Sequence, residues 1–147
     1  MMYNILVHLH SVNRWIVLAL IIYAIAKAFG GWFGKKEFTA SDKKNALFAL
    51  IFTHIQLILG MALYFISPFV SFEEGAIKNA LYRFYTIEHF TMMIIAIALI
   101  TLGFSLSKRN SESITKFKRI AVFYLIGLLI MLSSIPWPFR IPSAGWY

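Results

Sequence analysis

The sequence contains no cysteine among its 147 residues. That absence excludes disulfide scaffolds, thiolate metal sites, iron–sulfur clusters, thiol catalysis and the Cys-x-x-Cys-His attachment motif. Charge is also scarce, because 14% of the residues are charged and only six are acidic, whereas 60% are hydrophobic. A soluble domain has about 25% charged and about 45 to 50% apolar residues. The composition therefore excludes a water-soluble globule, and the length leaves room for a single membrane domain, residues 1–147.

Long apolar runs make up most of the chain. Each of four segments is able to cross a hydrocarbon core of about 30 Å, which requires roughly 20 helical residues. These segments are 4–29, 45–67, 83–107 and 117–136. Because short connections make neighbouring helices antiparallel, the sequence predicts an all-α integral membrane fold, an up-down-up-down bundle of four transmembrane helices.

The ends of the predicted segments carry further signals. The first apolar run also resembles a signal peptide that would end at 24–26, but no basic residues precede it, so we expect a helix of the mature protein. Ser41 and Asp42 are typical capping residues for the second helix. The tail 137–147 is rich in aromatic residues and proline, which favours an ordered segment at the outer membrane interface.

The formal net charge is +8, and ten of the fourteen basic residues lie in or beside two connections, 30–44 and 108–117. Such an excess is typical of cytoplasmic loops. We therefore expect a multi-pass protein of the bacterial inner (cytoplasmic) membrane, with these two loops in the cytoplasm and both termini outside. The same asymmetry accounts for the positive charge without nucleic acid, so the expected partner is the lipid bilayer.

Five ionisable side chains lie inside the predicted spans: His10, Arg14, His54, Glu88 and His89. Such residues are costly in hydrocarbon and by default indicate function. At about 1.5 Å of rise per residue, His10 and His89 both lie about 9 Å from the outer ends of their helices, whereas Arg14 lies at about 15 Å. His54 is deeper still, at about 18 to 20 Å. The two level histidines are thus the pair most able to meet.

The helical period predicts the direction of these side chains. At about 100° per residue, His10 and Arg14 share one side of the first helix. His89 lies on a stripe of the third helix that should face the interior of the bundle. On the second helix, His54 lies on a stripe that we also expect to face inward, together with Leu47, Leu50, Met61 and Phe65.

Two level histidines on different helices are the arrangement that a b-type haem requires, since neutral imidazole is a common axial ligand. We therefore expect His10 and His89 to ligate the iron of one haem b in the outer half of the bundle. Arg14, Arg83 and Arg140 are expected near its propionates. The alternative is that these polar side chains only form hydrogen bonds between helices.

The sequence allows more than one role for each of two further polar residues. His54 is expected to be a deeper cofactor ligand, a partner of Arg14, or, with Gln56, part of a quinone pocket, although Gln56 points away from it on the helical wheel. Glu88 either interacts with the helix N-terminus, where a carboxylate is favoured, or acts as a proton acceptor or a counter-charge to Arg14 or Arg83.

Four short motifs carry a resemblance to known proteins. They are His10-Ser11-Val12-Asn13-Arg14-Trp15, His54-Ile55-Gln56, Glu88-His89 followed by Met92-Met93, and Ser134-Ile135-Pro136-Trp137-Pro138-Phe139. Through them nearly the whole chain resembles a family of small bacterial four-helix membrane proteins known as cytochrome B. That resemblance implies haem b and electron transfer. The segment from His8 to Trp15 is also similar to the first helix of HemJ-type protoporphyrinogen oxidases and of CopD copper-resistance domains.

Three functions follow as hypotheses. The leading one is a membrane cytochrome that carries electrons between quinol and a partner in a respiratory chain. The second is a haem-dependent membrane oxidoreductase that oxidises quinol or a porphyrinogen, with His54 or Glu88 moving protons. The third is a non-catalytic accessory subunit of a larger respiratory membrane complex.

Overall fold

The computed structural model describes residues 1–141, and this part of the chain is helical with no strand. Four long helices form the bundle: α1 (Met2–Phe33), α2 (Ala40–Ile66), α4 (His89–Arg109) and α5 (Ser113–Ser134). A 3₁₀ turn (Ala76–Lys78), the short helix α3 (Ala80–Arg83) and a π-helical turn (Phe84–Glu88) lead into α4. With α3 and the π turn, α4 makes one continuous helix of 30 residues.

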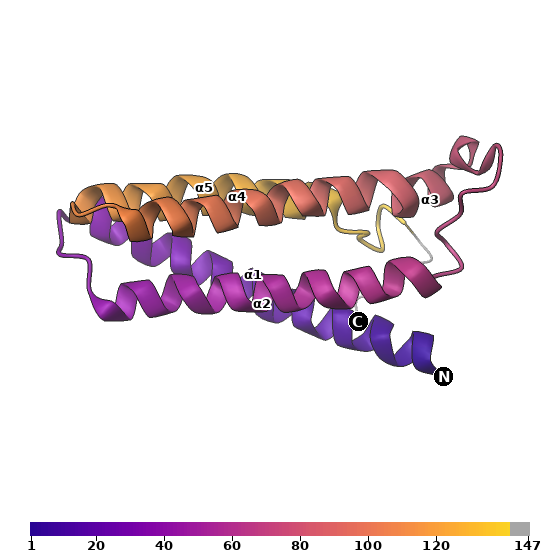
Figure 1. The fold of residues 1–147 in the computed structure, drawn as a ribbon, viewed down its shortest axis with the longest axis horizontal. Helices are drawn as coiled ribbons and strands as arrows, with labels where there is room; N and C mark the ends of the chain where they lie inside the picture. Colours follow the sequence, from indigo (N-terminus) through magenta and orange to yellow (C-terminus); the bar gives the residue numbers. More distant parts are fainter. Residues whose placement is uncertain (142–147) are drawn as a thin grey trace.

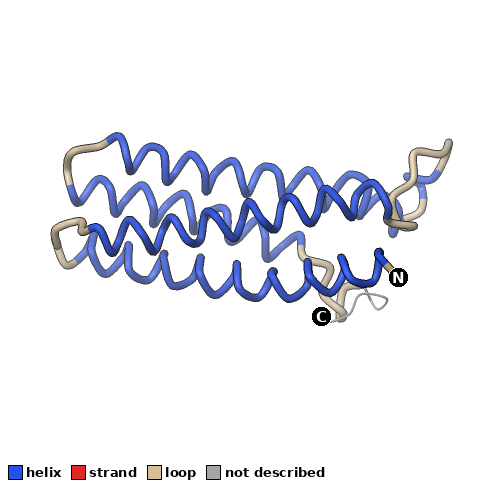
Figure 2. The backbone as a smooth tube through the Cα atoms, turned by 60° about the horizontal axis from the view of Figure 1, so that its bottom comes forward, coloured by secondary structure: helices blue, strands red, loops and turns tan. Residues whose placement is uncertain are grey.

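The four helices run alternately up and down, as predicted. In Figure 1, α1 and α2 form one layer and α4 and α5 the other, with α1 crossing obliquely behind α2. The helix α1 packs closely on α2, α4 packs closely on α5, and α5 packs against α1, whereas α2 and α4 contact each other only lightly. The tube in Figure 2 shows the connections gathered at the two ends of the bundle. We call the end with the 34–39 and 110–112 connections the basic end, and the other the N-terminal end.

All four long helices are apolar enough to cross a membrane. Many large apolar side chains point outward, such as Ile58 (68% exposed) and Leu129 (57% exposed). Exposure of these side chains to water would be unfavourable, whereas lipid tails are as apolar as the side chains themselves. The chain is accordingly a multi-pass membrane protein.

Small residues allow the helices to approach closely. A Cβ at Gly31 would overlap the ring of Phe117, which joins α1 to α5, and a Cβ at Gly103 would meet Phe123. Tyr124 is fully buried, and its hydroxyl donates to the carbonyl of Ala46 at 2.9 Å. The half of the bundle nearer the basic end is thus closely packed.

The helices are longer than the predicted segments at most ends, because apolar composition marks the hydrocarbon core and not the polar turns that extend beyond it. The second helix begins at Ala40 and is capped by Thr39 instead of Ser41, and Asp42 completes a capping box. The fourth helix ends at Ser134 and not at 136, since Ile135 is extended before Pro136.

Candidate cofactor-binding site

A cavity of about 240 Å³ lies in the N-terminal half of the bundle. Its wall is formed by the start of α1, the end of α2, the start of α4 and the end of α5, so all four helices contribute. Most of the wall is apolar, with Met61, Met93 and Met131 among its residues. We call it the site cavity. It holds two of the four histidines, His10 and His89.

His89 is positioned by the C-terminus of α5. Its Nδ1 lies 2.7 Å from the carbonyl oxygen of Ser134. Because a carbonyl only accepts, Nδ1 carries the proton, and the neutral ring therefore keeps its lone pair on Nε2. A histidine whose Nδ1 donates to a backbone carbonyl is oriented and ready to bind a metal through Nε2.

Prolines after α5 leave that carbonyl available. In a continuing helix the Ser134 oxygen would accept from the amide of residue 138, and the Leu132 oxygen from that of residue 136. Both positions are proline, which has no N–H. The Ser134 carbonyl instead accepts a hydrogen bond from His89 Nδ1, and the Leu132 carbonyl accepts one from Trp137 Nε1 at 2.9 Å.

His10 faces the same cavity from α1. Its Nδ1 is buried and has no hydrogen-bond partner among the residues that the structure describes. The ring packs against Gly60 of α2, where a Cβ would lie 3.2 Å from His10 Cε1. A glycine at that position therefore makes room for the imidazole.

A polar clamp joins α1 and α2 beside this histidine. Gln56 Nε2 donates to the His10 carbonyl at 2.9 Å, and Gln56 Oε1 accepts from Asn13 Nδ2 at 2.7 Å. Asn13 Nδ2 also donates to the Phe52 carbonyl at 3.2 Å. Two amide side chains thus set the register of the helix pair that carries His10.

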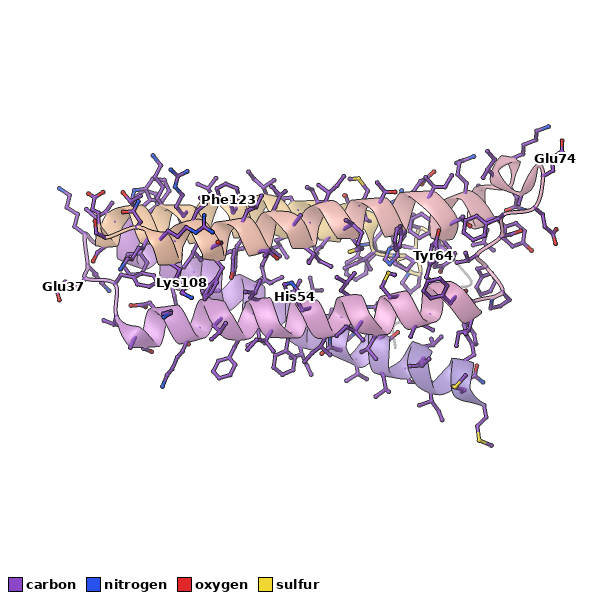
Figure 3. The ribbon with its side chains drawn as sticks, in the orientation of Figure 1. Glu37, His54, Tyr64, Glu74, Lys108 and Phe123 are labelled. Carbon is purple, nitrogen blue, oxygen red and sulfur yellow. The ribbon has the colours of Figure 1, made fainter. Side chains whose placement is uncertain are left out.

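The π turn rotates the chain just before His89. In this turn the His89 amide bonds the Phe84 carbonyl, five residues back. The carbonyl of Thr86 accepts from the Tyr64 hydroxyl of α2 at 2.9 Å. Figure 3 shows Tyr64 near the end of α2, on the side facing α4. Single π turns are frequent at functional sites, and here one fixes the helical phase of a cavity histidine.

Arg14 also lines the site cavity, one turn below His10. Its guanidinium carbon lies 5.4 Å from the centre of the Trp15 ring, where a cation is attracted to the aromatic face. The site cavity therefore contains two imidazoles and one permanent positive charge, in a wall that is otherwise mainly apolar.

The other predicted site residues lie elsewhere. His54 is outside the cavity wall, and its Nδ1 donates to the Leu50 carbonyl of its own helix at 2.9 Å. In the predicted stripe, Met61 lines the cavity and Leu50 packs against the core, whereas Phe65 is 78% exposed, so the stripe lies at the edge of the inward face. The buried face of α2 instead contains Ala46, Ala49 and Thr53.

Arg83 and Arg140 are at the N-terminal end of the bundle but outside the cavity. Arg83 Nε forms an exposed ion pair with Glu88 at 2.8 Å, so Glu88 is the counter-charge of Arg83. Arg140 donates to the Ser133 carbonyl and lies over the Phe84 ring. The tail thus folds back on α5 as far as it is described, and its residues 142–147 lie outside the described part.

Three features of the site were not predicted. The sequence alone associates Gln56 only with His54, the role of Gly60 depends on its contact with His10, and the π turn has no sequence pattern. A signal for Gln56 does exist, since an amide within an apolar helix favours an interhelical hydrogen bond.

Over residues 1–141 the structure has no group of three or more His, Cys, Asp or Glu side chains that can hold a metal ion. A cofactor that brings ligands of its own to the metal needs fewer protein side chains than that. Comparisons with protein-family models, with curated proteins and with solved structures gave no match to this chain.

Proposed function

We propose that the chain is a membrane b-type cytochrome that binds haem b in the site cavity and transfers electrons in a quinol or respiratory chain. One observation carries the proposal: His10 and His89, from opposite layers of the bundle, line the same cavity. Haem brings porphyrin nitrogens of its own to the iron, so the protein would need to supply only side-chain ligands such as histidine. Two histidines are therefore enough.

The residues present fit such a group. His89 offers Nε2 because its Nδ1 donates to Ser134, and His10 has a buried nitrogen that the described residues leave unsatisfied. A buried polar atom without a partner is costly, so a ligand at His10 would remove a penalty. When bound, haem supplies a one-electron couple whose potential depends on its axial ligands and on burial.

The remaining wall residues have supporting roles. The apolar wall, with Leu57 and Ile97 among its members, would exclude water from the haem. Arg14 would supply positive charge near a haem propionate. The polar clamp and the π turn hold the two histidines in place. A macrocycle would need a wider cavity, and of the adjacent helices α2 and α4 pack most lightly, so we expect the bundle to open between them.

We further propose the orientation that the charge asymmetry favours. The basic end, with connections 34–39 and 110–112, lies in the cytoplasm of a bacterial inner membrane. The site cavity then lies in the outer half of the bilayer, where quinol or a larger respiratory complex would exchange electrons with the bound group.

The test is the haem content of the gently solubilised chain, measured with its reduced-minus-oxidised spectrum. We expect stoichiometric haem with sharp reduced bands in the wild type. His10→Ala and His89→Ala should lose most of it, whereas the matched controls His8→Ala and His54→Ala, which lie outside the cavity, should retain it. Added imidazole should partly restore the spectrum of His89→Ala if the variant is folded. Full haem in either cavity variant would refute the ligand assignment.

The size of the cavity favours a second candidate, a site for a quinone without haem. Its volume of about 240 Å³ is below the range of about 300 to 1,000 Å³ that is common for small-molecule sites. A single quinone ring fits such a space without separation of the helices, near the Gln56 and Tyr64 side chains. A chain that stays colourless after growth with added haem, yet binds a short-chain quinone that Gln56→Leu no longer binds, would establish this function.

A further inference from the structure

A second cavity, of about 170 Å³, lies at the basic end of the bundle. It is formed by the start of α2 and the facing ends of α4 and α5. Three lysines, one from each of these helices, line it: Lys43, Lys108 and Lys116. We call it the lysine cavity. Figure 3 shows Lys108 near the basic end of α4, with Glu37 on the neighbouring connection.

Within residues 1–141 the lysines of this cavity form no ion pair with an acidic side chain. No acidic side chain is among the described residues that line it. Asp42 is engaged in the capping box, accepting from the Thr39 amide at 3.0 Å and hydroxyl at 2.7 Å, and Glu112 accepts from Thr115. The ion pair found within residues 1–141 joins Arg83 to Glu88, and it lies at the N-terminal end of the bundle.

The rest of the wall is apolar or weakly polar. Phe38 and Phe104 form its aromatic sides, and Lys116 Nζ lies 5.5 Å from the centre of the Phe38 ring. The Phe38 amide donates to Ser113 Oγ at 3.0 Å, which fixes the 34–39 connection against α5. Lys43 and Lys108 are exposed and Lys116 is half-buried, so the charged side chains border a recess that also has two aromatic residues in its wall.

We propose that the lysine cavity binds the phosphate group of an anionic phospholipid. Lysine is a point-charge binder of phosphate, and basic pockets between transmembrane helices bind anionic lipid head groups. The cavity lies where transmembrane helices end, which is the depth of the head groups. Its aromatic sides would contact the glycerol and upper acyl carbons that follow the phosphate. A free phosphate ion would leave them without a partner, so we assign the lipid.

The test uses the full chain in a zwitterionic detergent, with bound lipid counted by native mass spectrometry. Phosphatidylglycerol should be retained in preference to phosphatidylcholine. Removal of one lysine should weaken binding about fivefold, the effect of about 1 kcal/mol per basic residue at an anionic surface. The triple variant Lys43→Gln, Lys108→Gln, Lys116→Gln should abolish the preference. A triple Lys→Arg variant at the same positions should keep it.

The matched control removes the same charge from the same end, outside the cavity: Lys35→Gln, Lys36→Gln, Lys44→Gln. It should retain the lipid. Ala40→Phe, which fills the recess without changing charge, should release it, and circular dichroism will show whether each variant is folded. Equal loss in both triple variants, or no preference over phosphatidylcholine in the wild type, would overturn the proposal. Displacement of the lipid by millimolar inorganic phosphate would assign the site to free phosphate instead.

Discussion

The position of the His89 ring depends on two prolines that lack a backbone N–H. Pro136 and Pro138 supply no amide to the last turn of α5, and the Ser134 carbonyl is left for the His89 imidazole. The carbonyl end of a helix also carries partial negative charge, which favours an N–H donor. A cavity histidine is thereby oriented by a helix end 45 residues away in the sequence.

Gly60 and Gly30 form a matched pair for a test of the His10 contact. A Cβ at position 60 would lie 3.2 Å from His10 Cε1, whereas at position 30 it would meet nothing within 4 Å. Gly30→Ala should raise stability by up to about 1 kcal/mol through helix propensity, while Gly60→Ala should lower it by about 1 kcal/mol through overpacking. Thermal melting in detergent will measure both. Equal stabilisation by the two changes would show that the ring does not need the glycine.

Gln56 links α1 to α2 at the level of the site. Gln56→Leu removes its bonds to the His10 carbonyl and to Asn13, so we expect a loss of about 1 kcal/mol, the usual order for interhelical bonds in membranes. Thr101→Val is the control, because the Thr101 hydroxyl bonds the Ile97 carbonyl of its own helix at 2.8 Å. Melting temperatures should fall for the first variant and stay nearly constant for the second.

At the scale of elements, the π turn Phe84–Glu88 is held from outside its own helix. A π turn makes poorer use of backbone groups than an α-helix, and the Thr86 carbonyl accepts from Tyr64. The Thr86 hydroxyl in turn accepts from the Ser71 amide at 3.1 Å. Both α2 and the connection after it therefore stabilise the turn that precedes His89.

Tyr64→Phe should loosen this turn selectively. It deletes the hydroxyl that donates to Thr86, so amide exchange over 84–89 should become about threefold faster, as expected for a bond of about 0.6 kcal/mol. Exchange over 96–105 should not change. Tyr23→Phe serves as the control, since Tyr23 is 52% exposed on the outer face of α1. An unchanged rate in 84–89 would contradict the role assigned to Tyr64.

For the whole molecule, the contacts between helices are unequal. The helix pairs α1–α2, α4–α5 and α1–α5 pack closely, while α2 meets α4 only lightly. Both cavities lie along this light contact, the site cavity toward the N-terminal end and the lysine cavity at the basic end. The unequal packing leaves space for ligands on one side of an otherwise closed bundle.

The absence of cysteine permits a direct test of the proposed orientation. Single cysteines introduced as Glu37→Cys and Ser111→Cys lie at the basic end, and Glu74→Cys lies at the other; Figure 3 shows Glu37 and Glu74 at opposite ends. In intact cells an impermeant maleimide should label only Glu74→Cys. After lysis all three should react. Labelling of Glu37→Cys in intact cells would reverse the orientation.

Apolar runs and the connections between them were enough to predict the four-helix bundle, because hydrocarbon requires about 20 continuous apolar helical residues wherever a chain crosses it. The helical period also predicted the inward facing of His10, Arg14 and His89, since that period is constant along most of these helices. In the structure these three side chains line one cavity.

The facing of α2 depended on packing between helices. In lipid the outer face is as apolar as the inner one, so hydrophobicity did not distinguish the His54 position from the most buried face of α2, about 100° away through Thr53. Small residues and polar bonds mark that face: Ala46, Ala49, Gln56 and Gly60. Likewise the π turn, and the Ser134 carbonyl that orients His89, arise from contacts between distant segments, which no local pattern records.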